Sequence, residues 1–185
     1  MELMGLHGTS KSRADNILKD SFKPYPGRVG NGVYFWRENA FSRILAKGWF
    51  DFYLKKNNYD LDADKNFAYF KVKISVNEEN FLDLELPELK DQLALIAEKR
   101  NIDRKTHEDV ISALFDYFID TLEKELKTSF KVWQARVNAP YDCVEYPLSL
   151  LGNPICYVVI DSACISICNC YVLENGHERQ IYQSC

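Results

Sequence analysis

The chain has 185 residues, of which 46% are hydrophobic and 27% charged, and its formal net charge is −4. These proportions are typical of a globular protein with a sizeable core, so we expect a single domain spanning 1–185. The net charge does not favour nucleic-acid or anionic-membrane binding. No apolar run reaches the roughly 18 residues that a membrane span needs, and the N-terminus lacks a basic leader, so we expect a cytoplasmic protein.

The charge is unevenly distributed along the chain. Residues 1–60 contain ten Lys/Arg against six Asp/Glu, so the negative charge lies in the rest of the chain. A basic N-terminal third suits a phosphate-bearing ligand, although a solvated surface with chance asymmetry explains it equally well.

The first part of the chain predicts strands that alternate with helices. Ala14, Ile17 and Leu18 form an apolar stripe at helical spacing, and Thr9 or Ser10 can cap that helix. The predicted elements are a strand over 2–7, a helix over 11–19, a Pro- and Gly-rich loop over 22–32, a strand over 32–36 and a helix from Asn39.

The remainder predicts strands, then two helices, then strands again. In residues 67–76 every second side chain, from Ala68 to Val76, is apolar, which is typical of a strand with one face apolar throughout. A Thr106-His107-Glu108-Asp109 segment comes close to a capping box. The predicted elements are strands over 67–76 and 81–86, helices over 87–99 and 106–127, and strands over 130–137, 142–146, 155–161 and 163–173. This order predicts an α+β fold with a helical insertion over about 87–128.

All six cysteines lie in the last 43 residues of the chain. Without a secretory signal, we expect reduced thiols rather than disulfides. Zinc could be held by Cys164, Cys168, Cys170 and His177, but Cys-x3-Cys-x-Cys is not a zinc-knuckle spacing. We therefore expect no metal site.

Two short motifs carry the strongest functional signal. His7-Gly8-Thr9 ends one apolar run, and Gly32-Val33-Tyr34-Phe35 forms a second one 24 residues later. Cleavage of the nicotinamide glycosidic bond of NAD needs a fixed ribose, a gripped carboxamide and a ring against the pyridinium. Histidine can bond a ribose hydroxyl, glycine allows close backbone approach, and tyrosine can stack.

These residues resemble the ADP-ribosyltransferases of the diphtheria-toxin and poly-ADP-ribose-polymerase type, which are defined by a His–Tyr–Glu triad. The likeness covers residues 3–53 and, more weakly, 150–165, and it implies that family's split antiparallel β-sheet with flanking helices. Ser42 lies eight residues beyond Tyr34, where the family has a serine that binds the nicotinamide carboxamide. The resemblance implies NAD as co-substrate, bound by His7, Gly8, Thr9, Arg28, Gly32, Tyr34 and Ser42, with Phe41, Trp49 or Phe50 as a second aromatic against the nicotinamide.

The chain departs from the family at the third triad position. Segment 154–161 resembles the family's strand that carries the glutamate, but it has Cys156 in place of that acid. A thiol is a poor hydrogen-bond partner compared with a carboxylate. Glu145, on a neighbouring predicted strand, could supply a carboxylate instead, and Glu174 and Glu178 are further candidates. The simpler interpretation is that all three are acidic residues on the surface.

The resemblance implies an NAD-dependent mono-ADP-ribosyltransferase with catalytic candidates His7, Tyr34, Cys156 and Glu145. Such an enzyme would release nicotinamide and modify a protein or nucleic-acid acceptor. Bacterial toxins and phage-defence effectors of this kind do so. An antitoxin or another protein partner could bind the helices of 87–128. The alternative is a weakly active or inactive module that binds NAD, ADP-ribose or a protein. A third reading, a tRNA 2′-phosphotransferase, shares the His-Gly-Thr start, but those enzymes have an Arg and a second His where this chain has Gly-Val-Tyr-Phe.

Overall fold

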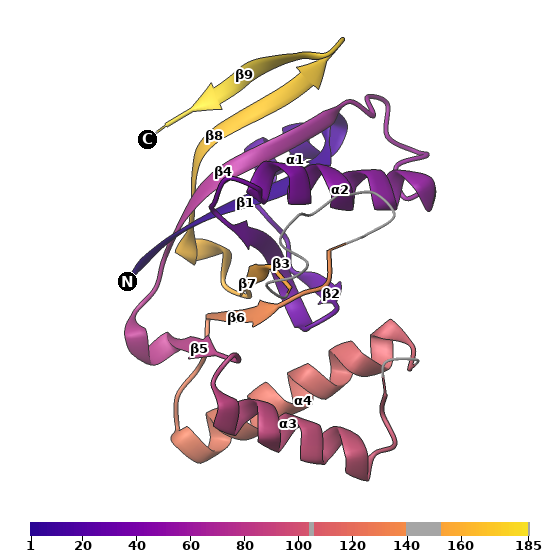
Figure 1. Ribbon diagram of the computed structural model, residues 1–185. Helices are drawn as coiled ribbons and strands as arrows, with labels where there is room; N and C mark the ends of the chain where they lie inside the picture. The colour runs from indigo at the N-terminus through magenta and orange to yellow at the C-terminus, as the bar shows by residue number, and fades with distance from the viewer. Residues whose placement is uncertain (104–105, 140–152, 185) are drawn as a thin grey trace.

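A nine-stranded, mostly antiparallel sheet forms the centre of the protein (Figure 1). The computed structural model describes residues 1–103, 106–139 and 153–184. Within them the strand order is β5-β6-β7-β3-β1-β4-β8-β9, β2 pairs with β3, and β5–β6 is the parallel pair. The predicted α+β class is confirmed. The strands are β1 Glu2–Ser10, β2 Tyr25–Gly27, β3 Gly30–Arg37, β4 Phe67–Ser75, β5 Phe81–Asp83, β6 Val132–Arg136, β7 Ile155–Val159, β8 Ile165–Glu174 and β9 His177–Gln183.

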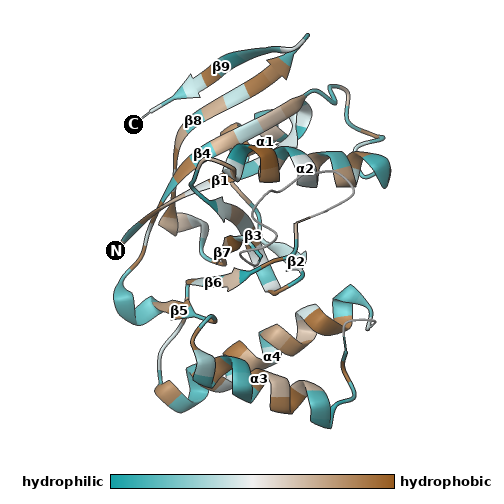
Figure 2. Cartoon of the chain, viewed as in Figure 1, coloured by the Kyte–Doolittle hydropathy of each residue, from teal (hydrophilic) through white to brown (hydrophobic). Residues whose placement is uncertain are grey.

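Helices cover both faces of the sheet. They are α1 Lys11–Asp20, α2 Ser42–Lys55, α3 Pro87–Lys99 and α4 Glu108–Leu126. One apolar cluster joins α2 and α4 to one set of strand positions, and another joins α1 to the alternate set. Hydrophobic and hydrophilic residues interleave along β4 and β8 (Figure 2), in keeping with the side chains of a strand pointing to alternate faces. Among the described residues, no helix has the length and apolar character to cross a membrane.

Strands β1 and β3 pair over a short length only. Gly5 and Leu6 pair with Arg37 and Trp36, whereas all nine residues of β1 pair with β4. Beyond Leu6 the β1–β3 ladder stops, although both strands continue. The sheet therefore opens between them, beside the two motifs that the sequence analysis singled out.

Several predicted boundaries were wrong. The strand expected to end at 7 runs on to Ser10, because β4 pairs with it through Phe67. The 22–32 loop contains β2, which folds back on the start of β3. The helix predicted from Asn39 begins at Ser42, the strand predicted over 81–86 ends at Asp83, and the sequence analysis missed β9. The strand expected over 142–146 lies outside the described residues.

The predicted capping box at the start of α4 does not form. The hydroxyl of Thr106 accepts a hydrogen bond from the backbone of Asp103 (2.9 Å), and the Asp103 carboxylate accepts from the backbone of Thr106 (3.1 Å). Thr106 thus closes a turn before the helix. His107 becomes the N-cap, with its ring accepting from the backbone of Asp109.

Gly8 is needed for the packing of α2 on β1. A Cβ atom at this position would lie 2.4 Å from the backbone carbonyl oxygen of Ala46 and 2.9 Å from its carbon. Backbone atoms in a helix cannot move aside as a flexible side chain can. The glycine of the His-Gly-Thr motif therefore has a structural reason to be there, independent of any ligand.

We predict that Gly8→Ala lowers the free energy of unfolding by about 2 kcal/mol or more, because α2 must shift away from the sheet. Urea unfolding followed by circular dichroism measures this. Gly176→Asn is the matched control: nothing lies within 4 Å of its Cβ position, and asparagine tolerates the φ of +80° there. A Gly8→Ala protein as stable as the control would contradict this packing argument.

Candidate functional site

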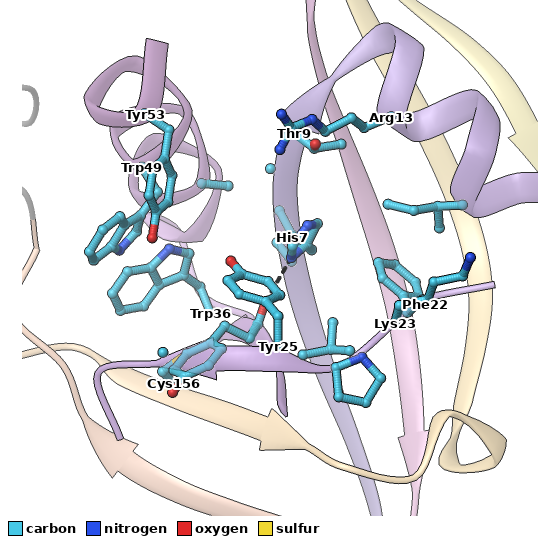
Figure 3. Close-up of a pocket in the computed structure, with 18 of the residues that line it drawn as sticks. His7, Thr9, Arg13, Phe22, Lys23, Tyr25, Trp36, Trp49, Tyr53 and Cys156 are labelled. Atoms are coloured by element: carbon cyan, nitrogen blue, oxygen red, sulfur yellow. Dashed lines mark hydrogen bonds between the residues drawn. The ribbon is translucent and has the colours of Figure 1, made fainter. Parts of the chain in front are cut away.

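A cavity of about 540 Å³ lies where β1 and β3 separate. Residues of α1, α2, β1, β3, β7 and the β2–β3 hairpin line it. Figure 3 shows His7 and Tyr25 in the middle of this view, with Trp49 and Tyr53 of α2 on one side and Phe22 and Lys23 on the other. The volume falls within the range of small-molecule and cofactor sites.

His7 bridges the opening between the two strands. Its Nδ1 lies 2.9 Å from the backbone carbonyl oxygen of Tyr34, and its ring packs edge-on against Phe22. Because a carbonyl only accepts hydrogen bonds, Nδ1 must carry the proton. Burial lowers the pKa of His7 below its usual value, although the bond to Tyr34 acts in the opposite direction. His7 is therefore neutral near pH 7, with Nε2 as a hydrogen-bond acceptor.

Tyr34 lines the same cavity, as expected, but its hydroxyl is already engaged. The hydroxyl donates to the carbonyl of Gly30 (2.5 Å) and accepts from the backbone N–H of Val29 (3.0 Å). Its ring packs on Gly27, where a Cβ would lie 2.5 Å from ring carbons. Burial raises the pKa of Tyr34, so the phenol stays neutral. Tyr34 thus holds the β2–β3 hairpin in place and can offer a ligand its ring rather than its hydroxyl.

Further aromatic side chains complete the cavity wall. Trp36 and Trp49 stack with centroids 6.5 Å apart, and Tyr53 lies 5.5 Å from Trp49. Of the three second aromatics considered from the sequence, Trp49 lines the cavity, whereas Phe41 and Phe50 are not among its lining residues. The sequence analysis missed Trp36, Tyr53 and Tyr25 as lining residues; the spacing of Trp49 and Tyr53 at i and i+4 was the available signal.

Positive charge predominates among the charged lining residues. Three cations, Arg13, Lys23 and Arg28, line the cavity, with Asp20 as the acid among the described lining residues. Of these three cations, only Arg28 was expected from the sequence. Arg13 and Asp20 lie on one face of α1, as their spacing of seven residues allows. Arg13 is also bonded to Asp62 (3.1 Å), whereas Lys23 is exposed at the rim.

Cys156 lies in the cavity wall, on β7 opposite Trp36. It is 2% exposed, and its thiol contacts the carbonyl oxygen of Tyr157 at 3.6 Å. Burial raises the pKa of this thiol, so it is neither a thiolate nor a substitute for a carboxylate at physiological pH. The structure thus places Cys156 at the cavity without giving it a negative charge.

Two residues expected to bind the cofactor lie outside the cavity lining. Ser42 is 2% exposed, and its hydroxyl donates to the carbonyl oxygen of Asn39 (2.9 Å), which fixes the start of α2. Gly32 packs against β7, where a Cβ would lie 2.4 Å from Val158. Gly8 and Thr9 do line the cavity, and the Thr9 side chain is hydrogen-bonded to Tyr59.

Two of the three alternative acids, Glu174 and Glu178, lie away from this site. Glu145 lies outside the described residues, so its role stays a prediction. Glu174 pairs with Arg179 (2.8 Å) and Glu178 with Arg43 (2.7 Å), and neither acid lines the cavity.

The cysteine cluster considered as a zinc site is largely internal. Cys168 and Cys170 are buried in β8, while Cys164 lies in a 3-10 turn before it rather than on the same strand. The described residues contain no group of three or more His, Cys, Asp or Glu side chains placed to hold a metal ion.

The chain matches no protein-family model, and a search of curated proteins returns no significant match.

We predict that the stability of the protein falls as the pH drops below about 6.5. With the pKa of His7 lowered in the folded state, the unfolded chain binds more protons below its own pKa, so acidification favours unfolding. His7 contributes at most about 1.4 kcal/mol per pH unit. Urea unfolding at pH 7.5, 6.0 and 5.0 measures the free energy of unfolding at each pH. This free energy should change less with pH in His7→Asn than in the wild type. Asparagine retains a hydrogen-bond donor for the carbonyl oxygen of Tyr34. The exposed-site variant His177→Gln is the control, and equal slopes for all three proteins would refute the prediction.

Proposed function

We propose that this cavity binds NAD and that the chain is an NAD-dependent mono-ADP-ribosyltransferase. The observation that carries the proposal is that His7 and Tyr34, from motifs 24 residues apart, line one cavity at the point where β1 and β3 separate. The opening between these strands also supports the expected split-sheet fold, with α3 and α4 as the helical insertion.

The lining residues suit the parts of NAD. The rings of Tyr34 and Trp49 supply aromatic surface for the pyridinium, whose positive charge favours such contacts. The neutral His7 offers Nε2 to a ribose hydroxyl. Arg28 and Lys23 supply positive charge for the pyrophosphate. Since Ser42 is engaged by Asn39, backbone groups near Gly8 are the better candidates for gripping the carboxamide.

The reaction requires few covalent steps from the protein. The bond between the ribose anomeric carbon and the nicotinamide nitrogen breaks, and its electron pair leaves with neutral nicotinamide. A nucleophile on a protein or nucleic acid then bonds to the anomeric carbon and loses a proton. The transition state has oxocarbenium character, so orientation and electrostatic stabilisation provide most of the catalysis.

A second function is favoured by Cys156. Its buried, neutral thiol offers the ribose 2′-hydroxyl no carboxylate at this position of the cavity wall. The chain would then be a module that binds NAD or ADP-ribose with little or no turnover. Glu145 is the candidate whose carboxylate would distinguish the transferase from this module.

Nicotinamide release from NAD tests the transferase. We expect His7→Ala to reduce the rate by about 100-fold, because the ribose loses an orienting contact. The control His177→Ala, on the edge strand β9, should retain the wild-type rate. Equal rates for the wild type and His7→Ala would rule out the proposed site. NAD binding by calorimetry without release from the wild type would favour the binding module.

Restoring an acid provides the complementary test. We expect Cys156→Glu to increase nicotinamide release at least about tenfold, because a carboxylate bonds a hydroxyl more strongly than a thiol does. Cys156→Gln is the size-matched control without a charge, and thermal unfolding checks that both variants fold. No gain in Cys156→Glu over Cys156→Gln would show that position 156 does not face the ribose.

A further inference from the structure

Arg28 connects the cavity to α4. Its Nη2 lies 2.8 Å from a carboxylate oxygen of Glu108, the first residue of α4, and its guanidinium lies over the ring of Trp49 at 4.8 Å. Arg28 lines the cavity, whereas the Glu108 side chain is 56% exposed. A cavity residue is thus held by a carboxylate from a different part of the chain.

The surface between α4 and the β2–β3 hairpin leaves several polar atoms unpaired. Among the described residues, the buried side-chain atoms without a hydrogen-bond partner are Nε of Arg28, Oδ1 of Asn31 and Oγ of Ser112. Arg28 and Asn31 lie on the hairpin, and Ser112 lies one turn beyond Glu108 on α4. A further turn along, Asp116 accepts from the backbone of Asn31 (2.7 Å). This junction is therefore incompletely bonded, and Arg28 has an unused donor within it.

We propose that Glu108 competes with an anionic ligand group for Arg28, so that α4 lowers the affinity of the cavity for pyrophosphate-bearing ligands. This inference rests on the proposed function, because it concerns the same cavity. An ion pair with one exposed partner is weak. A pyrophosphate carries more charge and can accept from Nε and Nη2 together, which is the strong bidentate geometry of arginine.

The competition also has a reciprocal consequence. If Glu108 weakens ligand binding, the bound ligand must weaken the contact between Glu108 and Arg28 by the same factor. Ligand binding then loosens the start of α4 from the hairpin. How firmly the α3–α4 pair is held to the hairpin thus depends on whether a ligand occupies the cavity.

Calorimetric titrations of the full chain with ADP-ribose, inorganic pyrophosphate and nicotinamide test the proposal. We expect Glu108→Gln to bind ADP-ribose and pyrophosphate about three to ten times more tightly than the wild type, with nicotinamide affinity unchanged. Asp109→Asn is the matched control, since it removes a charge from the same helix end without contacting Arg28. In an Arg28→Gln background, Glu108→Gln should no longer have an effect.

The outcomes separate this proposal from the proposed function. If the wild type binds ADP-ribose and Glu108→Gln binds it equally or more weakly, the competition is refuted and the proposed function stands. If no variant binds ADP-ribose but pyrophosphate binding still tightens in Glu108→Gln, the competition stands and the proposed function fails. If no variant binds either compound, both proposals fail.

Discussion

One side-chain hydrogen bond, from Nδ1 of His7 to the carbonyl oxygen of Tyr34, spans the place where β1 and β3 stop pairing. The backbone ladder ends at Leu6, and the imidazole takes over the contact between the two strands. Because the same ring lines the cavity, the group that joins the strands also faces the cavity. The bond fixes the tautomer of His7, and burial keeps the ring neutral.

Much of the fold follows from patterns within short segments. The alternation over 67–76 and the apolar stripe of α1 predicted elements that the structure contains, because burial on one face imposes a period on the sequence. The strand β9 was missed because its residues are mostly exposed and polar, so no such period exists. The role of Ser42 could not be predicted from the sequence either. Its hydroxyl donates to the backbone carbonyl of Asn39, three residues earlier. The residue type and its distance from Tyr34 do not show whether a serine makes such a local bond or binds a ligand.

Some of the residues that line the cavity could be predicted from the sequence, because they lie in short recognisable segments. His7 and Tyr34 were identifiable because each lies in a short motif, whereas Trp36 and Tyr53 acquire their place only when α2 packs on the sheet. The contact of Arg28 with Glu108 joins residues 80 positions apart and depends on how α4 crosses the hairpin. Ion pairs between residues far apart in the chain leave no periodic trace in a sequence. The sequence predicted the helices of 87–128 as an insertion without assigning them a role at the site, yet α4 contacts a residue of the cavity.

The glycines of the two motifs were expected to allow close approach of a ligand, but the structure gives them a role in packing. Gly8 leaves room for the backbone of Ala46 in α2, and Gly32 leaves room for Val158 of β7. Both glycines are therefore required by packing inside the protein. Natural selection for folding alone would preserve both glycines, whether or not the cavity binds a ligand. A short glycine-containing signature of this kind is therefore evidence about interior packing first, and about ligand chemistry only where its neighbouring side chains also line an open cavity.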